Sequence, residues 1–157
     1  MVIEYIFDLI ICMYLAKIAW VDFKILKIKN KSLCCLSIIL TIRLIVLDVD
    51  LKNIIWSIMI NLIIFGTIYF YPKQLMGAGD LKLAVVLSLW CNYPQCIVAI
   101  YLSFIIGGII AVYFLLKNID KVNKKDRISF APMLILGNII AFWEADRILN
   151  LWFNLIG

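Results

Sequence analysis

The chain alternates six long apolar runs with short charged or polar breaks. A run of about 20 apolar residues matches the thickness of a bilayer core, so the pattern predicts membrane-spanning helices. The fourth run is too short to cross a core of about 30 Å unaided, and we expect neighbouring helices to shield it from lipid. The predicted fold class is an all-α membrane protein, a bundle of about six transmembrane helices with a short fourth one. The predicted segments are 3–21, 32–47, 53–71, 80–91, 96–116 and 129–153.

The composition agrees with this prediction. Hydrophobic residues make up 66% of the 157 positions, against roughly 45–50% in soluble domains. No polar stretch is long enough to build a soluble domain, so we expect residues 1–157 to form a single integral membrane domain. The first apolar run lacks a small-residue cleavage site and is expected to be a retained span rather than a signal peptide.

The basic residues predict an orientation. Eleven of the fifteen Lys and Arg residues lie in the first, third and fifth loops, at 22–31, 72–82 and 117–128. Positively charged loops stay on the cytoplasmic side, so we expect these loops in the cytoplasm and both termini outside. Attraction to anionic lipid explains the net charge of +5. The expected partner is therefore a lipid bilayer and not nucleic acid.

Several residues within the segments have simple expected roles. Arg43, near the end of the second segment, is expected to extend toward the lipid headgroups. Glu144, Asp146 and Arg147 are expected to form a locally paired cluster at the outer interface. The adjacent glycines at 107–108 indicate close packing of the fifth segment against another helix.

Asp22 and Asp80 are the acidic residues at the inner boundary whose flanks are strongly apolar. Two interpretations remain open at this point. Either aspartate can be a helix cap or an ion-pair partner for Lys24 or Lys82. Alternatively, the two carboxyls meet, share one proton and titrate as a coupled pair. One then deprotonates a water while the other donates to the scissile carbonyl, which is the chemistry of aspartic peptidases.

The glycines that frame Asp80 suit the second interpretation. Gly77 and Gly79 can adopt backbone angles closed to other residues, and they allow a substrate strand to approach closely. Histidine is absent from the sequence, which excludes Ser-His-Asp and Cys-His nucleophiles and zinc sites built from imidazole. Paired carboxylates are the hydrolytic chemistry that remains.

The five cysteines contain no CxxC pair, and we expect neither a metal nor another cofactor. Cys91 and Cys96 bracket one short loop. They are either small apolar packing residues or, if the loop faces an oxidising space, a disulfide.

Three motifs resemble one known family. Residues 77–83, GAGDLKL, resemble the GxGD signature, GAGDxKL, of the type IV prepilin peptidases and their preflagellin peptidase relatives. The first family aspartate is followed after six residues by Pro-Asn or Pro-Asp; here Asp22 is followed at that spacing by Lys29 and Asn30. Residues 127–134, RISFAPML, resemble a third family element. In that element Ser129 and Ala131 replace a proline and a glycine, while Pro132 is kept.

The resemblance covers nearly the full chain and implies a function. A member of this family is a membrane aspartic endopeptidase that removes the basic leader from prepilin-like or preflagellin-like membrane proteins at the cytoplasmic boundary of the prokaryotic plasma membrane. The implied catalytic pair is Asp22 and Asp80. The implied substrate-binding or active-site loop residues are Gly77, Gly79, Asn30, Lys82 and Pro132. Lys82 either bends back toward Asp80 or extends toward the headgroups, and we favour the second.

The bifunctional members of the family carry an N-terminal cytoplasmic region, often with paired CxxC motifs, that is linked to N-methylation of the cleaved pilin. This chain starts at its first span, so we expect a short form with peptidase activity and without N-methyltransferase activity.

Three other classes of protein share some of these sequence features. Peptidases of the presenilin type also use GxGD but need more spans than this length supplies. A small multi-pass transporter or channel would use Asp22 and Asp80 as ion or proton sites, with carboxylates near the bilayer middle and inverted repeats, neither of which is evident here. A catalytically inactive scaffold for pilus assembly has no need of both aspartates.

Overall fold

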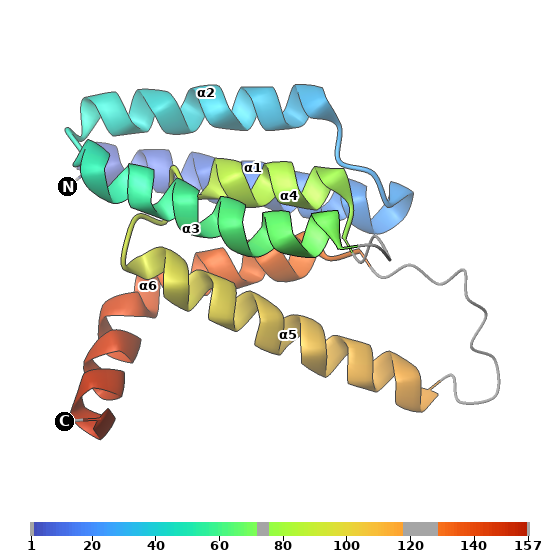
Figure 1. The fold of residues 1–157 in the computed structure, drawn as a ribbon. Coiled ribbons are helices and arrows are strands. Elements are labelled where there is room, and N and C mark those ends of the chain that lie inside the picture. Colours follow the sequence, from blue (N-terminus) through green and yellow to red (C-terminus); the bar gives the residue numbers. More distant parts are fainter. Residues whose placement is uncertain (1, 72–75, 118–128, 157) are drawn as a thin grey trace.

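The fold is built from helices alone in the part of the chain that the structure describes. This computed structural model describes residues 2–71, 76–117 and 129–156. Six helices follow one another along the chain (Figure 1). They are α1 (Val2–Ile25), α2 (Asn30–Val46), α3 (Leu51–Phe70), α4 (Ala78–Leu87), α5 (Gln95–Lys117) and α6 (Ala131–Ile156). The prediction of an all-α protein with six helices and a short fourth one is confirmed.

Membrane spanning is a separate question from helix content. Of the described helices, two are long and apolar enough to cross a membrane, Leu51–Phe70 and Gln95–Phe114. Helix α1 is long enough but contains several charged residues, and α4 with its ten residues is only about 15 Å long. Length and composition therefore identify two candidate spans, and the predicted six-span topology remains a proposal.

Successive helices run in alternating directions, so the connections gather at two ends of the bundle (Figure 1). The end of α1, the start of α4 and the start of α6 lie at the right in that view. Both chain termini lie toward the left. The helix ends that flank the first, third and fifth connections therefore lie at the same end of the bundle, as the sequence pattern predicts.

The buried face of α1 follows helical periodicity. Its buried residues are Asp8, Ile11, Leu15, Ile18 and Asp22, at spacings of three and four, so they form one stripe along the helix. An acidic residue bounds this stripe at each end. Between them the apolar residues join a core to which all of the helices contribute, with Leu36, Phe65, Leu87, Ile100 and Leu134 among its members.

Helices α5 and α6 pack closely at Gly137. A Cβ atom at this position would clash with Ser103 Oγ and lie 2.8 Å from the carbonyl oxygen of Ala99. The prediction that glycines 107–108 mediate close helix packing holds for Gly107 and not for Gly108. A Cβ at Gly107 would meet the Phe130 ring at 3.2 Å and Met133 Cγ of α6 at 4.0 Å, while one at Gly108 would meet nothing within 4 Å.

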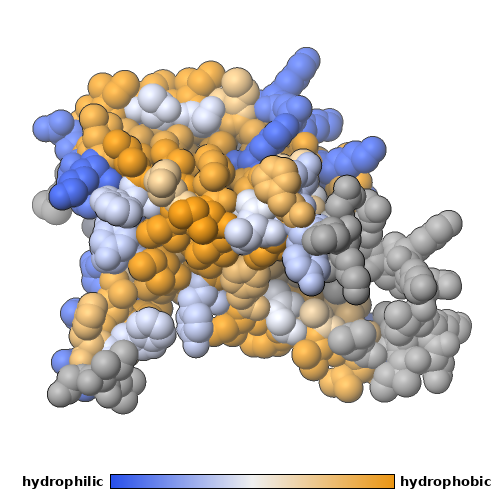
Figure 2. All heavy atoms as spheres, viewed as in Figure 1, coloured by the Kyte–Doolittle hydropathy of each residue, from blue (hydrophilic) through white to orange (hydrophobic). Residues whose placement is uncertain are grey.

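The outer surface is strongly apolar. Large hydrophobic side chains are exposed on five of the helices, among them Met13 on α1, Ile45 on α2, Leu62 on α3, Ile109 on α5 and Leu151 on α6. Figure 2 shows hydrophobic atoms over the middle of the visible face, with hydrophilic residues gathered toward its ends. Exposed apolar surface on this scale marks contact with a membrane or a partner.

Two sequence expectations about side chains are settled by the fold. Cys91 and Cys96 are both buried free thiols, so the packing interpretation holds for them and the disulfide does not form. The expected local pairing in the last segment is found between Arg147 and Glu144, whose closest atoms are 3.0 Å apart.

Candidate active site

A cavity of about 1160 Å³ opens at the end of the bundle where α1 ends and α4 and α6 begin. Its walls come from every helix except α2. The residues that line it are Asp22, Leu26, Lys27, Ile28, Ile68, Tyr69, Met76, Gly77, Ala78, Gly79, Asp80, Phe104, Gly107, Gly108, Ala111, Ser129, Phe130 and Met133. Most of these are apolar or glycine, so the carboxyls of Asp22 and Asp80 stand out in a largely apolar chamber.

Asp22 lies in the last full turn of α1 and is 4% exposed. The Ser129 hydroxyl, from the segment just before α6, donates a hydrogen bond to Asp22 Oδ2. The chain turns away directly after the helix because Leu26 adopts a left-handed conformation with φ of 53°. Its N–H still donates to the Asp22 carbonyl oxygen at 2.8 Å. A non-glycine residue in this conformation is strained, which is common near functional sites.

Asp80 lies in the first turn of α4 and is half-buried. The partial positive charge of a helix N-terminus favours a carboxylate at this position. The Asp80 N–H donates to the Gly77 carbonyl oxygen at 3.1 Å, which closes the first turn. Across the cavity, the charge of Asp22 acts on the Asp80 carboxyl. The fold thus brings together two carboxyls that are 58 positions apart in the sequence.

Neither Gly77 nor Gly79 adopts the special backbone angles that were expected. Gly77 has extended backbone angles, φ −75° and ψ 146°, and no described glycine has a positive φ. What these positions require is space. A Cβ at Gly77 would lie 3.2 Å from Asp80 Oδ2, and a Cβ at Gly79 would lie 3.3 Å from the Cβ of Ile28. The expectation of special backbone angles is therefore wrong, and the absence of a side chain is what matters.

The simple structural interpretations of the aspartates are not supported by the geometry. The N-cap of α4 is Gly77, so Asp80 is not its cap. The described residues form two ion pairs, Arg43–Asp8 and Arg147–Glu144, and neither contains Asp22 or Asp80. The Lys24 ammonium lies over the Trp20 ring, 4.9 Å from its centroid.

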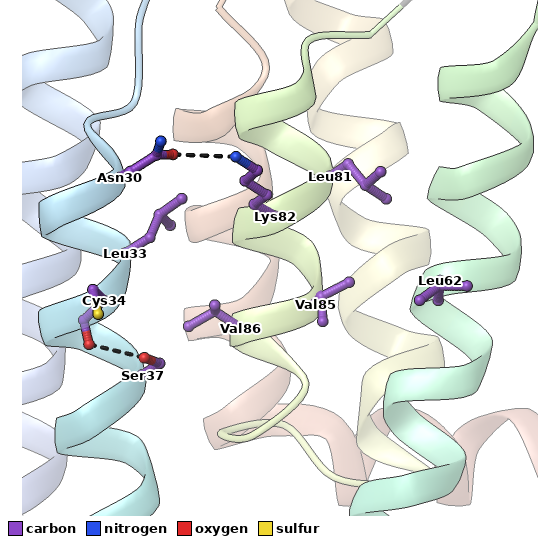
Figure 3. A pocket seen from close by; sticks show the side chains of 9 residues that line it. All are labelled: Asn30, Leu33, Cys34, Ser37, Leu62, Leu81, Lys82, Val85 and Val86. Atoms are coloured by element: carbon purple, nitrogen blue, oxygen red, sulfur yellow. Dashed lines mark hydrogen bonds between the residues drawn. The ribbon is translucent and has the colours of Figure 1, made fainter.

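Asn30 and Lys82 lie together, but in a second pocket. Lys82 Nζ donates to Asn30 Oδ1 at 3.3 Å, joining α4 to the start of α2 (Figure 3). This pocket has a volume of about 430 Å³ and is otherwise lined mainly by apolar side chains of α2, α3 and α4. Lys82 points toward α2 in this view and does not bend back to Asp80.

Pro132 is the second residue of α6, where the fixed φ of proline suits the first helical turn. It is half-buried and lines neither pocket. The first two residues of the RISFAPML motif, 127–128, lie outside the described residues. Ser129 lines the cavity but is not among the candidate residues that the sequence indicated. The available signal was a hydroxyl two residues before the start of α6.

The described residues contain no group of three or more His, Cys, Asp or Glu side chains that could hold a metal ion. The cavity offers two carboxyls, the hydroxyls of Ser129 and Tyr69, and the ammonium of Lys27. A pair of carboxyls can activate a water molecule and protonate a carbonyl oxygen in the same site.

Fold and cavity together define a class: a helical protein with an apolar exterior that gathers two carboxyls from separate helices at one end of its bundle. Comparison with known families identifies the class more closely. The model of the type IV leader peptidase family matches residues 9–112, a range that includes both aspartates and both glycines. The chain belongs to this family.

Curated relatives agree with the assignment. A prepilin leader peptidase/N-methyltransferase of Legionella pneumophila is 33% identical over 84 residues, which cover 52% of this chain and 27% of that protein. The protein of the same name from Xanthomonas campestris pv. campestris is 30% identical over 89 residues, covering 52% of this chain and 30% of the relative. One from Stutzerimonas stutzeri is 25% identical over 104 residues, covering 63% and 35%. The chain therefore matches about a third or less of each relative's length. No solved structure matches it.

Proposed function

We propose that this protein is a membrane aspartic endopeptidase that removes the basic leader from type IV prepilin-like or preflagellin-like substrates. The observation that carries the proposal is the shared cavity of Asp22 and Asp80, two carboxyls from separate helices whose charges interact. Family membership supplies the substrate class.

In the proposed reaction, the aspartate pair holds one proton and acts as a unit. The ionised carboxyl takes a proton from water, whose oxygen attacks the scissile carbonyl carbon. The protonated carboxyl donates to the carbonyl oxygen, giving a tetrahedral intermediate. Collapse of this intermediate breaks the C–N bond, and the leaving amine takes a proton from the pair. Ser129 orients Asp22 throughout through its hydrogen bond.

The cavity has room for this reaction. A volume of about 1160 Å³ exceeds the range of roughly 300–1,000 Å³ that is typical of small-ligand sites. An extended peptide segment can enter it beside the first turn of α4, where Gly77 and Gly79 carry no side chain. We propose that the segment preceding the substrate's hydrophobic helix binds there.

The proposed location is the prokaryotic plasma membrane, with several spans, the cavity on the cytoplasmic side and both termini outside. Three observations support it: the apolar exterior of the bundle, the two candidate spans, and the concentration of basic residues in the odd loops. In this proposal residues 1–157 act as a single integral membrane peptidase domain with the lipid bilayer as their partner.

We limit the proposed activity to hydrolysis. The relatives are also named N-methyltransferases, but the matched segments make up 27% to 35% of those proteins. The matching family model is that of the leader peptidases. The methyl-transfer part of the relatives' name is therefore not carried over to this chain.

The proposal is tested by co-expressing the chain with a prepilin that has a basic leader, a glycine and an apolar helix, and following leader loss by electrophoretic mobility. Asp22→Asn and Asp80→Asn should each abolish processing while the protein still accumulates in the membrane. Asp48→Asn is the matched control, because Asp48 lies at the other end of the bundle in a left-handed conformation that asparagine also tolerates. Normal processing by either the Asp22→Asn or the Asp80→Asn variant would contradict the aspartate mechanism.

A further inference from the structure

A buried ion pair lies at the end of the bundle opposite the cavity. Arg43 Nε donates to Asp8 Oδ1 at 3.0 Å, and the two side chains are 5% and 4% exposed. The expectation that Arg43 extends toward lipid headgroups is wrong, because a buried carboxylate is within its reach. Trp90 Nε1 donates to the same Asp8 oxygen at 3.2 Å.

An aromatic residue completes this cluster. The Arg43 guanidinium lies over the Phe142 ring, 5.4 Å from its centroid. The Trp90 ring stacks on the same Phe142 ring, with centroids 4.7 Å apart and planes inclined by 20°. We call Asp8, Arg43, Trp90 and Phe142 the outer cluster. Its members come from α1, α2, the turn after α4, and α6, so four segments meet in it.

The outer cluster joins the two segments that carry the candidate catalytic residues. Asp8 and Asp22 bound the same buried stripe of α1, about 21 Å apart along the helix axis at 1.5 Å per residue. Trp90 lies three residues after the end of α4, the helix whose first turn contains Asp80. The hydrogen bond from Trp90 to Asp8 therefore connects α1 with the segment after α4 at one end of the bundle. The same two helices, α1 and α4, carry Asp22 and Asp80 at the other end.

This link matters because α1 and α4 do not pack backbone against backbone. Within the described helices, no Cα atom of α1 lies within 8 Å of a Cα atom of α4. Both helices contribute large side chains to the shared core, such as Leu15 and Leu87. Apolar contacts are non-directional and allow sliding, whereas hydrogen bonds fix distance and angle.

Stability alone does not account for a buried ion pair. Removing two charges from water costs about as much as their attraction returns, and apolar replacements of similar volume are often neutral or stabilising. In a lipid environment intramembrane charges are costly as well. A directional connection between helices is a role that apolar side chains cannot fill.

We propose that Asp8, Arg43 and Trp90 are positioning residues that fix α1 and α4 lengthwise, so that Asp22 and Asp80 meet in the cavity. This inference rests on the proposed peptidase function for its kinetic consequences. Its geometric consequence, a fixed spacing of α1 and α4 at the cavity end, does not depend on any substrate.

Two variants test the proposal. Trp90→Phe removes the indole N–H and leaves a ring to stack on Phe142. The double variant Asp8→Leu/Arg43→Met removes both charges together, so no unpaired charge is left buried. We expect each to lower kcat for a prepilin in proteoliposomes by about tenfold or more, with KM changed less, because a misplacement of about 1 Å costs up to about a hundredfold in rate.

The pH–rate profile separates positioning from mere folding. As Asp22 and Asp80 move apart their interaction weakens, so the bell-shaped pH–rate profile of the pair becomes narrower. The matched control is Glu144→Gln/Arg147→Gln, which removes an exposed ion pair within one turn of α6. This control should keep the wild-type rate and profile. A lowered rate with an unchanged profile width would overturn the proposal.

A second measurement needs no substrate. In a background without native cysteines, spin labels are placed at Phe23 on α1 and Lys82 on α4, both exposed near the cavity end. We expect Trp90→Phe and the double variant to broaden or shift the measured distance distribution, and the α6 control to leave it unchanged. An unchanged distribution in both variants would overturn the positioning role. If the wild-type protein cleaved no prepilin, the peptidase proposal would fail. The spin-label distance would still test whether Asp8, Arg43 and Trp90 position α1 and α4.

Discussion

Asp22 receives its hydrogen bond from a residue that departs from the family motif. Ser129 occupies the place of a proline in the motif that the sequence resembles, and its hydroxyl donates to Asp22 Oδ2. A proline there could not make this contact because it has no donor. In this chain, therefore, the segment before α6 contributes to the active site through a side chain as well as through its shape.

Ser129→Ala should lower kcat by about tenfold, because a hydrogen bond to a charged group contributes about 1.5–3 kcal/mol and each 1.4 kcal/mol is a factor of ten. KM should change less, since Ser129 orients Asp22 and is not expected to bind the leader. The measurement is steady-state cleavage of a purified prepilin. Ser37→Ala is the control: Ser37 donates to a carbonyl oxygen of its own helix and lies outside the cavity. Equal rates for both variants would contradict a role for Ser129.

The Gly77→Ala variant tests whether the Asp80 carboxyl needs the space that a glycine leaves beside it. Alanine fits the extended backbone angles at this position, but its Cβ would lie 3.2 Å from Asp80 Oδ2 and push the carboxyl by a few tenths of an ångström. We expect Gly77→Ala to fold normally and to cleave prepilin roughly 3–10-fold more slowly, because the carboxyl is displaced from its reactive position.

Gly66→Ala is the matched control for Gly77→Ala. A Cβ at Gly66 on α3 would meet nothing within 4 Å, and the residue does not line the cavity. Cleavage by this control should match the wild type. A Gly77→Ala enzyme as fast as the control would rule out crowding of Asp80 as the reason for glycine in the motif.

At the scale of the helices, α5 and α6 pack against each other with Gly137 in a tight part of the contact. A Cβ at Gly137 would clash with Ser103 Oγ and lie 2.7 Å from the Ser103 backbone nitrogen. We expect Gly137→Ala to destabilise the protein by about 1–3 kcal/mol, the usual cost of overpacking. In thermal unfolding in detergent this variant should have a lower Tm.

Gly108→Ala provides the comparison on the partner helix. Nothing lies within 4 Å of a Cβ at Gly108, so helix propensity should dominate and raise stability by about 0.5–1 kcal/mol. The two substitutions are chemically identical and should shift Tm in opposite directions. Shifts of the same sign would contradict the assignment of close packing to Gly137.

The helices could be predicted from the sequence more fully than their contacts. Apolar runs and charged breaks located six helices with a short fourth, because hydropathy reports local burial and length directly. That Asp22 and Asp80 lie at the same end of the bundle was predicted from the charge pattern of the loops, and their pairing from the resemblance of the adjacent motifs to one family. Arg43 and Asp8 are 35 positions apart, and hydropathy carries no information about which buried charges face each other. The contact at Gly137 was missed for the same reason, since it depends on how two helices cross.

For the whole molecule, the arrangement of connections makes the proposed topology testable. The helices alternate in direction, and the ends of the odd connections lie with the cavity, while both termini lie toward the other end (Figure 1). The odd loops hold eleven of the fifteen basic residues. If the bundle spans the membrane with these loops in the cytoplasm, the α1–α2 and α2–α3 connections must face opposite sides.

Single cysteines at Lys29 and Asp48, in a background without native cysteines, report this directly. Both positions are exposed, the first between α1 and α2 and the second between α2 and α3. A membrane-impermeant maleimide should label the Asp48→Cys variant in intact spheroplasts, and the Lys29→Cys variant only in inverted vesicles. Labelling of both from one side would show that α2, with 17 residues, does not cross the bilayer. The proposed orientation, in which a cytoplasmic leader reaches Asp22 and Asp80, would then be wrong.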